Sequence, residues 1–529
     1  MTPLMGALVR VVVLAAVPLA VLGTLFVLPV SAMIGRGLDG GIGPVLDVLA
    51  RPRVHRVLWF TLWSSTVATA IAVLLGVPAA SVLYRLRWPG SRAVRALVMT
   101  PFAMPSVVVG IAFRQLLSEG GPLGGLGLDH SAAAVIAGLV FFNVPLVVRT
   151  VGLAWEGLDP EPAEAAAVLG AGPATVFRRV TLPALRPAIG GSAAAVFLFC
   201  ATAFGIVLML GGLRYASVET EIYLLTTNLL DLRAAAALSL LQLLVVAALL
   251  LLTGRLQREA PTERGIAQPR AVRRSDVPAL GATLVLAALI VVPVATLVSG
   301  SLRRDGAWTP ANYRALAGLA GDAIATSLLT AVVATLAAMA LGLLVAYVVS
   351  RPSRTGAERR LRLALDAVFM LPLGVSAVTL GFGLLLALGR WRDDPWLVPM
   401  AQALVALPLV VRTLVPVWAG IDDQLRDAAA TLGASPWRIL LRVDLPLVRG
   451  AAAGAAGLAA AVSLGEFGAT SFLARDEHPT LPILVYRLLS HPGAANYGGA
   501  LAASVVLGAV TTVVLLAGER AATRHRPFT

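Results

Sequence analysis

About twelve uncharged, apolar stretches recur along this chain, and they limit its possible folds more than any other feature. A helix of about 20 apolar residues crosses the hydrocarbon core of a bilayer. With 58% hydrophobic and 13% charged residues, the chain is also too apolar for an ordinary soluble domain. We therefore predict an all-α integral membrane protein with about 12 transmembrane helices. The predicted spans cover residues 8–30, 58–84, 96–113, 131–148, 187–213, 234–254, 277–299, 323–350, 367–389, 395–418, 450–473 and 496–518.

The first apolar stretch could be either a cleaved signal peptide or a retained helix. No charged residue interrupts it from Val11 to Gly35, and only Arg10 precedes it. This length exceeds that of the hydrophobic region of a signal peptide. We therefore predict a retained transmembrane helix at the start of the chain.

The net charge of +14 is distributed as in a membrane protein and not as in a nucleic-acid-binding protein. All 42 basic residues are arginines, and they fall unequally on alternate loops between the predicted spans. One set of loops, which includes both termini and residues 149–186, 255–274 and 412–449, holds 28 of them, and the other set holds 14. Arginine-rich loops stay on the cytoplasmic side. We therefore predict a multi-pass protein of the cell (plasma) membrane that contacts the lipid bilayer and no nucleic acid, with both termini cytoplasmic.

The sequence EAAAVLGAGPATVFRRVTLP at 164–183 and the sequence DAAATLGASPWRILLRVDLP at 427–446 share one pattern, 263 residues apart. Each half of the chain has six predicted spans in the same orientation, so the chain contains a parallel internal repeat. Between the halves lies a charged segment without an apolar run, as expected of a cytoplasmic linker. We predict a first six-span repeat over 1–254 with its core at about 58–254, a linker over 255–276, and a second six-span repeat over 277–529 with its core at about 323–518.

Two repeated segments, residues 159–183 and 422–446, are each predicted to form a helix, a turn and a second helix. Asp159 and Asp422 are suited to cap the first helix of each segment. The glycine that ends this helix permits either a positive φ or a close approach of another backbone. These glycines are Gly170 and Gly433, and the segments are predicted to close at Leu182-Pro183 and Leu445-Pro446.

This repeated pattern resembles the cytoplasmic loop of binding-protein-dependent ABC importer permeases. In that family the acidic residue and the glycine of the loop belong to the contact with the ATPase subunit, and small alanines permit close docking. Asp427 departs from the family by replacing Glu, which shortens the side chain. Val176, Phe177, Ile439 and Leu440 are expected to add the apolar contact with the ATPase. The coupling positions implied by the resemblance are Glu164, Ala165, Ala166, Gly170, Leu182, Pro183, Asp427, Ala428, Ala429, Gly433, Leu445 and Pro446.

Almost the whole chain is similar to the fused, two-repeat permeases of type I ABC importers. Residues 218–244 and 463–489 look like parts of the thiamine and iron(III) permeases, and both substrates remain open. The resemblance implies two copies of a separate ATPase subunit and an extracytoplasmic substrate-binding protein that contacts outer loops such as 36–56 and 214–233. The chain has no lysine and therefore no Gly-rich phosphate loop ending in Lys. We predict a transport subunit that is not an enzyme and binds no cofactor, while the partner subunit uses ATP.

Glu466 is an isolated carboxylate inside the predicted span 450–473, and Ala203 occupies the equivalent position in the first half. Charge inside a membrane is costly, which makes such a residue a functional candidate. Glu466 either lines or gates the translocation path, or is a packed residue satisfied by a neighbouring helix or water. The five histidines lie on different loops and the single cysteine is Cys200, so we predict no metal site and no disulfide within one copy.

Two other classes of protein compete with the importer interpretation. A secondary transporter with two six-helix halves would use an ion gradient and should contain several ionisable groups inside the membrane. Glu466 is nearly alone in this respect, and the repeated segments would have no role. A membrane anchor or scaffold would leave the two similar segments equally unexplained.

Overall fold

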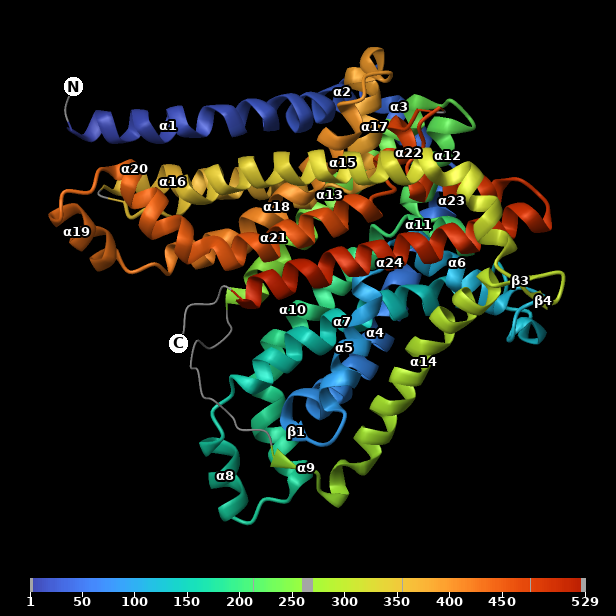
Figure 1. Ribbon diagram of the computed structural model, residues 1–529, viewed down its shortest axis with the longest axis horizontal. Coiled ribbons are helices and arrows are strands. Elements are labelled where there is room, and N and C mark those ends of the chain that lie inside the picture. The colour runs from blue at the N-terminus through green and yellow to red at the C-terminus, as the bar shows by residue number, and fades with distance from the viewer. Residues whose placement is uncertain (1–2, 213, 259–269, 354, 476, 525–529) are drawn as a thin grey trace. The chain divides into compact units, whose positions relative to one another are not determined.

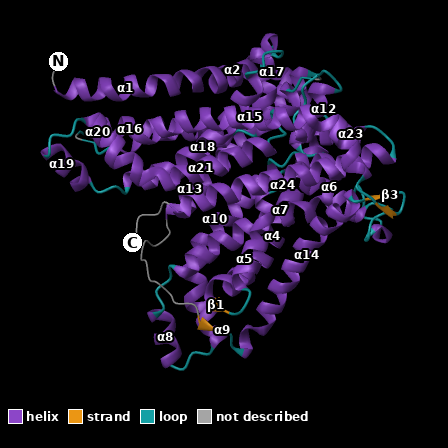
Figure 2. Ribbon diagram, in the orientation of Figure 1, coloured by secondary structure: helices purple, strands orange, loops and turns teal. Residues whose placement is uncertain are grey.

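A computed structural model describes residues 3–212, 214–258, 270–353, 355–475 and 477–524, and nearly all of this part is helical (Figure 1, Figure 2). Helices satisfy their backbone hydrogen bonds internally, which an apolar stretch in a bilayer requires. The strands in this part are two short pairs. They are β1 (Leu86–Arg87) parallel to β2 (Arg270–Ala271), and β3 (Arg303–Arg304) antiparallel to β4 (Ala307–Trp308).

The chain forms two compact units, and unit 1 joins residues Met1–Asp39, Thr226–Ala236 and Ala311–Thr529. Its core lies between the long helices α15, α18 and α21, where small alanines surround the buried ring of Trp418. The helices of unit 1 are α1 (Pro3–Leu22), η1 (Gly23–Val27), α2 (Leu28–Gly37), α15 (Ala311–Ser350), α16 (Gly356–Met370), η5 (Leu371–Gly374), α17 (Ala377–Leu388), η6 (Gly389–Trp391), α18 (Leu397–Ala419), α19 (Asp423–Thr431), α20 (Pro436–Ile439), η7 (Leu440–Asp444), α21 (Leu445–Gly465), α22 (Thr470–Leu473), α23 (Leu481–Ser490) and α24 (Ala494–Arg524).

Unit 2 joins residues Gly40–Leu225 and Ala237–Pro310. Its helices α4, α7 and α10 pack together as α15, α18 and α21 do in unit 1. The helices of unit 2 are α3 (Ile42–Leu49), α4 (Pro52–Arg85), α5 (Ser91–Ala103), α6 (Ser106–Leu117), η2 (Gly124–Leu126), α7 (Ala132–Glu156), α8 (Glu161–Val168), α9 (Pro173–Val176), η3 (Phe177–Thr181), α10 (Leu182–Ala201), α11 (Gly205–Leu210), η4 (Arg274–Asp276) and α14 (Val277–Ser301). Helices α12 (Val218–Thr227) and α13 (Leu232–Arg258) contribute residues to both units.

The two halves of the sequence exchange their first helices. The helices that begin the first half belong to unit 1, and α14, which begins the second half, belongs to unit 2. In unit 1, α1 runs along α15 and α2 packs on α17 (Figure 1). The approach is close at Gly383, where an added Cβ would lie 3.0 Å from Pro29 and 3.3 Å from Met33. In unit 2, α14 packs on α4, α5 and α6. The two compact units therefore do not coincide with the two sequence repeats, which were predicted over 1–254 and 277–529.

Ten helical stretches of the described residues are long and apolar enough to cross a membrane. Two more predicted spans, 96–113 and 367–389, are broken in the structure. Their halves meet at bends of 105° and 96°. The first break follows from Pro105, which pushes Met104 out of the helical region to ψ 138°. The ten continuous stretches are Val11–Gly37, Pro52–Arg85, Ala132–Glu156, Pro173–Ala201, Leu232–Leu250, Val277–Ser301, Ala320–Ser350, Leu397–Ala419, Pro436–Gly465 and Ala494–Thr523.

The internal repeat is visible in matching side-chain contacts within the two units. In unit 2 the Thr61 hydroxyl accepts a hydrogen bond from the Val218 amide at 3.0 Å. In unit 1 the Ser327 hydroxyl accepts the corresponding bond from Leu481 at 2.6 Å. Each of these bonds satisfies the first amide of the following short helix. The repeat is therefore a repeat of packing and capping as well as of sequence.

Candidate functional site

Both repeated segments contain the predicted helix, turn and second helix. In the first segment, Asp159 accepts a hydrogen bond from the Glu161 amide at 3.0 Å at the start of α8. In the second, Asp422 accepts one from the Gln424 amide at 2.9 Å at the start of α19. Asp422 is therefore the N-cap as predicted, whereas α8 begins at Glu161 with Pro160 at its N-cap position, so that Asp159 bonds to it from one residue further out. Each bond satisfies one of the amides that the first turn of a helix leaves without a partner.

The turn in each segment is built around a glycine with a positive φ. Gly170 has φ +86° and Gly433 has φ +78°. The Gly170 amide bonds to the carbonyl of Ala167, and the following amide bonds to the carbonyl of Ala166, both at 3.0 Å. The same two bonds recur after α19, and together they form a Schellman motif. An added Cβ at either glycine would meet nothing within 4 Å in the chain, so the need for glycine is conformational.

The second helix of each segment continues into a transmembrane helix without a break. Residues Pro173–Ala201 form one stretch through α9, η3 and α10, and Pro436–Gly465 form one through α20, η7 and α21. The prediction that Leu182-Pro183 and Leu445-Pro446 close the segments is therefore wrong. Each proline lies inside its continuous stretch, as the second residue after the π-helical turn η3 or η7. The predicted spans 187–213 and 450–473 accordingly begin too late and end too late.

Equivalent residues of the two segments are exposed to a similar degree. Glu164, Ala165, Asp427 and Ala428 are exposed, and so are both turn glycines. Ala166, Ala429, Leu182, Pro183 and Leu445 are half-buried, and Pro446 is exposed. Leu169 and Leu432, which precede the two glycines, are each 88% exposed. The sequence analysis did not single out these two leucines, which are exposed to the same degree at the same place in both copies.

The four residues expected to supply the apolar contact are instead half-buried. Phe177 stacks on Trp155 at 6.1 Å between ring centroids, and Leu440 packs against the core of unit 1. Val176 and Ile439 are half-buried as well. The most exposed of the large apolar residues on the segments are Val168, Leu169, Leu432 and Trp437, at 87%, 88%, 88% and 67% exposure.

Buried charges hold the second segment in place. Asp444 is fully buried and accepts hydrogen bonds from Arg426 Nε at 2.8 Å and from Arg351 Nη2 at 2.6 Å. Arg426 also donates to Asp423 at 2.6 Å. Burial opposes the charge of Arg426, but its bonds to Asp444 and Asp423 outweigh burial and raise the pKa of Arg426. The sequence signal for this group is that Arg426 and Asp444 correspond to the uncharged Ala163 and Thr181 of the first segment.

A known protein family matches part of each half of the chain. The family of binding-protein-dependent transport system inner membrane components matches the chain twice, over residues 72–259 and 338–526. Each match contains one repeated segment. The chain belongs to this family. The double match confirms a fused, two-repeat permease of the ABC importer type.

Similar proteins extend over almost the whole permease. Thiamine transport system permease protein ThiP of Brucella abortus (strain 2308) is 29% identical over an alignment of 524 residues, which covers 94% of this chain and 93% of that protein. The protein of the same name from Escherichia coli (strain K12) is 28% identical and covers 87% of this chain and 86% of its own. A solved bacterial ABC transporter involved in the import of the acidic polysaccharide alginate has a TM-score of 0.40 and 19% identity, with 48% of this chain and 98% of that chain covered.

Glu466 lies directly after the last residue of α21 and is 6% exposed in this permease. Its carboxylate accepts hydrogen bonds from the Ala469 amide at 2.7 Å and the Thr470 amide at 2.9 Å, and from the Thr470 hydroxyl. It therefore caps the short helix α22. Of the two predicted alternatives, these contacts fit the packed residue, although the carboxylate is satisfied by its own turn rather than by a neighbouring helix.

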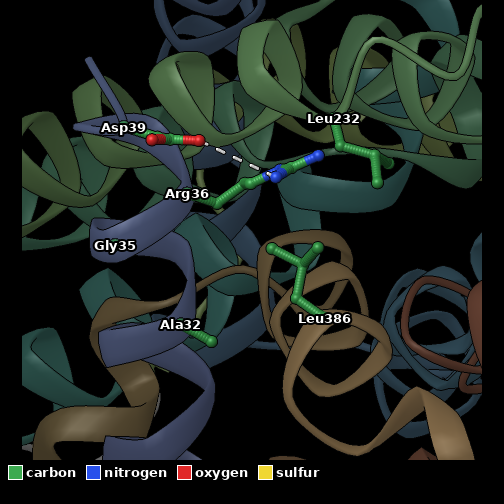
Figure 3. Close-up of a pocket in the computed structure, with 6 residues that line it drawn as sticks. All are labelled: Ala32, Gly35, Arg36, Asp39, Leu232 and Leu386. Carbon is green, nitrogen blue, oxygen red and sulfur yellow. Dashed lines mark ion pairs between the residues drawn. The ribbon is translucent and has the colours of Figure 1, made fainter.

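A pocket of about 440 Å³ lies within unit 1 of the permease (Figure 3). Arg36 and Asp39, which lie three residues apart on one segment, pair at 3.8 Å beside it, and Asp39 also lies 3.9 Å from Arg233. These side chains are half-exposed, so each ion pair contributes at most about 1 kcal/mol. The pocket brings together the ends of two loops that the arginine distribution assigns to the outer side. Its lining residues are Ala32, Gly35, Arg36, Asp39, Leu232 and Leu386.

The side chains able to bind a metal lie apart from one another in the part of the permease that the structure describes. No three His, Cys, Asp or Glu side chains of that part lie close enough together to hold a metal ion. Cys200 is buried and receives a hydrogen bond from Asn143 Nδ2 at 3.4 Å.

Proposed function

We propose that this permease is driven by two copies of a separate ATPase subunit, one docked on each repeated segment. The observation that carries the proposal is that a short glycine turn joins an exposed leucine and an exposed acidic residue of each segment to a transmembrane helix. In the first segment these are Leu169 and Glu164, followed by Pro173–Ala201. In a rigid helix, displacement of one end moves the other. ATP binding and hydrolysis in the partner would thus move α10 and α21.

The proposed cargo is thiamine. Support comes from the two relatives named as thiamine transport system permeases, which align with 94% and 87% of this chain. Iron(III), the other substrate left open by the sequence, has no such support. The permease itself is proposed to bind no cofactor, with ATP used only by the partner subunit.

The proposed orientation places both termini and both repeated segments in the cytoplasm. The arginine distribution supports it, because the loops on that side carry 28 of the 42 arginines. A substrate-binding protein would then approach from the other side. The pocket at Arg36 and Asp39, which joins two outer loops, is the proposed part of its docking surface.

Reconstitution with and without the ATPase tests the proposal. The permease, its ATPase and its binding protein would be placed in liposomes, and uptake of radiolabelled thiamine would be measured with ATP, without ATP, and with an imposed proton or sodium gradient. We expect uptake only with ATP and both partners, and no reduction by excess ferric iron. Uptake driven by an ion gradient without ATP would instead establish the secondary transporter. Ferric iron uptake without thiamine uptake would overturn the proposed cargo only.

Labelling of single introduced cysteines tests the orientation independently. A cysteine at Glu161 or Gln424 should react with a membrane-impermeant maleimide only after the cytoplasmic face is opened. Reaction in intact cells would place the segment outside and end the proposal.

A further inference from the structure

The charged group at Asp444 joins four parts of unit 1. Arg351 directly follows the last residue of α15, and its guanidinium lies 4.6 Å from the ring centroid of Tyr347 on that helix. Arg426 belongs to α19, the outer helix of the repeated segment. Asp444 is the last residue of η7, directly before α21. The fourth part is the end of α18, where the Trp418 carbonyl accepts a bond from Arg426 Nη2 at 3.5 Å.

The burial of this group makes it a rigid connection. Asp444 has no exposed side-chain surface, and the side chain of Arg426 is 8% exposed. A buried charge whose partner is removed is strongly unfavourable, so the group forms and breaks as a whole. Both oxygens of Asp444 are used, one by each arginine, and the two arginines are balanced by Asp444 and Asp423. The second segment is therefore fixed in angle to α15, α18 and α21.

The first segment has no charged counterpart at the same two positions. Ala163 stands where the second segment has Arg426, and Thr181 stands where it has Asp444. Helix α8 packs on α9 and η3, its own neighbours in the segment. Below them, Phe177 stacks on Trp155, and Arg85 lies 5.8 Å from the ring centroid of Trp155. A stacked ring pair leaves more freedom of rotation and sliding than the two directional, charge-assisted hydrogen bonds that the buried Asp444 carboxylate accepts.

We propose that Asp444 is a positioning residue that locks the second repeated segment to its helical bundle, so that motion imposed on α19 reaches α15, α18 and α21 without loss. The first segment transmits motion through ring stacking and a cation–π contact instead of an ion pair at these positions, and the two ATPase sites are therefore coupled unequally to transport. This inference rests on the proposed function, since it specifies how one of the two docked segments passes on force.

The ratio of ATP hydrolysed to thiamine transported is the measurement that tests it. The complete transporter with Asp444→Ala would be compared in liposomes with wild type and with Thr181→Ala, the matched change in the first segment. We expect Asp444→Ala to retain the ATPase on purification but to raise ATP used per thiamine by roughly 2- to 30-fold, the range of changes that alter coupling between sites. Thr181→Ala should keep the wild-type ratio. A purely structural loss would lower hydrolysis and uptake together and leave the ratio unchanged.

A double-mutant cycle adds a second criterion. Because Arg426 and Asp444 act in one group, Arg426→Ala combined with Asp444→Ala should change the ratio little more than Asp444→Ala alone. Additive effects would contradict a single lock. Should Asp444→Ala fail to accumulate in membranes, Asp444→Asn replaces it, because its amide oxygen still accepts one arginine bond. The same rise, smaller in size, is then expected.

Spin labels provide a readout that does not depend on transport. In a Cys200→Ala background, labels at Gln424→Cys and at the equivalent Glu161→Cys would report motion of α19 and α8 in the full permease. We expect Asp444→Ala to increase mobility at residue 424 and to leave residue 161 unchanged. Unchanged spectra at both positions in Asp444→Ala would overturn this inference alone. So would a wild-type ratio of ATP to thiamine in Asp444→Ala, measured where the wild-type complex couples hydrolysis to uptake. Failure of the wild-type chain to hold the ATPase would instead overturn the proposed function.

Discussion

Gly170 and Gly433 end matching helices in the two repeated segments with the same left-handed backbone, at φ +86° and +78°. Both are exposed, and neither is approached by another part of its own chain within 4 Å of an added Cβ. The pair therefore fixes the direction of the chain after α8 and α19. This direction sets the position of the exposed leucine before each glycine relative to the transmembrane helix that follows.

Replacing both glycines by valine should release the ATPase while leaving the permease in the membrane. A left-handed backbone costs about 1–2 kcal/mol for a residue with a side chain, and a β-branched residue is among the worst suited. We expect the turns to reorganise, and the amount of co-purified ATPase to fall. The matched control is Gly172→Val, because Gly172 has φ −67° and ψ 160°, which valine adopts without strain. Equal retention of ATPase by the double variant and the control would contradict the role of the turns.

Removal of the exposed leucines should weaken ATPase binding without affecting folding. Burying a leucine contributes about 1.5–3 kcal/mol, and alanine retains part of this, so Leu169→Ala and Leu432→Ala should each weaken binding by roughly 5- to 30-fold. Titration of purified ATPase onto the permease in nanodiscs measures this. Leu126→Ala, a change at a 60% exposed leucine outside the segments, is the control. Binding unchanged in both segment variants would place the ATPase contact elsewhere.

The sequence predicted the features that depend on neighbours along the chain. The aspartates at the helix starts, Asp159 and Asp422, and the turn glycines follow from local backbone chemistry, which a short segment contains in full. The all-α membrane fold follows from the long apolar stretches, and the family from the resemblance of the repeated segments to a known loop.

Features that depend on contacts between distant residues were missed. Asp444 meets Arg351 across 93 positions, and no local pattern reveals such a contact. The broken spans were missed for another reason: hydropathy averages over a bend, so 96–113 and 367–389 read as continuous. The prolines of the Leu-Pro pairs were interpreted as helix ends, although each lies inside a continuous helical stretch.

The capping role of Glu466 predicts that its removal lowers stability and not the rate of transport per folded molecule. In Glu466→Ala, the buried amides of Ala469 and Thr470 lose their acceptor, which costs about 1–3 kcal/mol for each group left unsatisfied. Thermal unfolding in detergent should show a lower midpoint, and Glu466→Gln should lose less because its amide oxygen still accepts. Uptake per folded transporter should match wild type in the Gln variant. A selective loss of uptake at unchanged stability would instead place Glu466 in the path.

The charge of Asp276 is predicted to hold the linker on the first repeat from pH 7 down to at least pH 5. Arg270 donates two bonds to this carboxylate, at 2.7 and 2.8 Å, while β2 pairs with β1 through Leu86 and Arg270. The side-chain hydrogen bond from Arg270 outweighs the opposing effect of burial, and the Arg273 amide adds to it, so the pKa of Asp276 lies below its ordinary value.

A carboxyl group whose pKa is lower in the folded state stabilises that state above its ordinary pKa, and this stabilisation is lost as the pH falls through the lowered value. Hydrogen exchange at residues 86–87 and 270–271, corrected for intrinsic rates, should therefore show the same protection at pH 7 and pH 5. Asp276→Asn, which removes the charge as protonation does, should lose protection already at pH 7, whereas Asp47→Asn at an exposed site should not. Equal protection in wild type and Asp276→Asn at pH 7 would show that the strand pairing holds the linker without the ion pair.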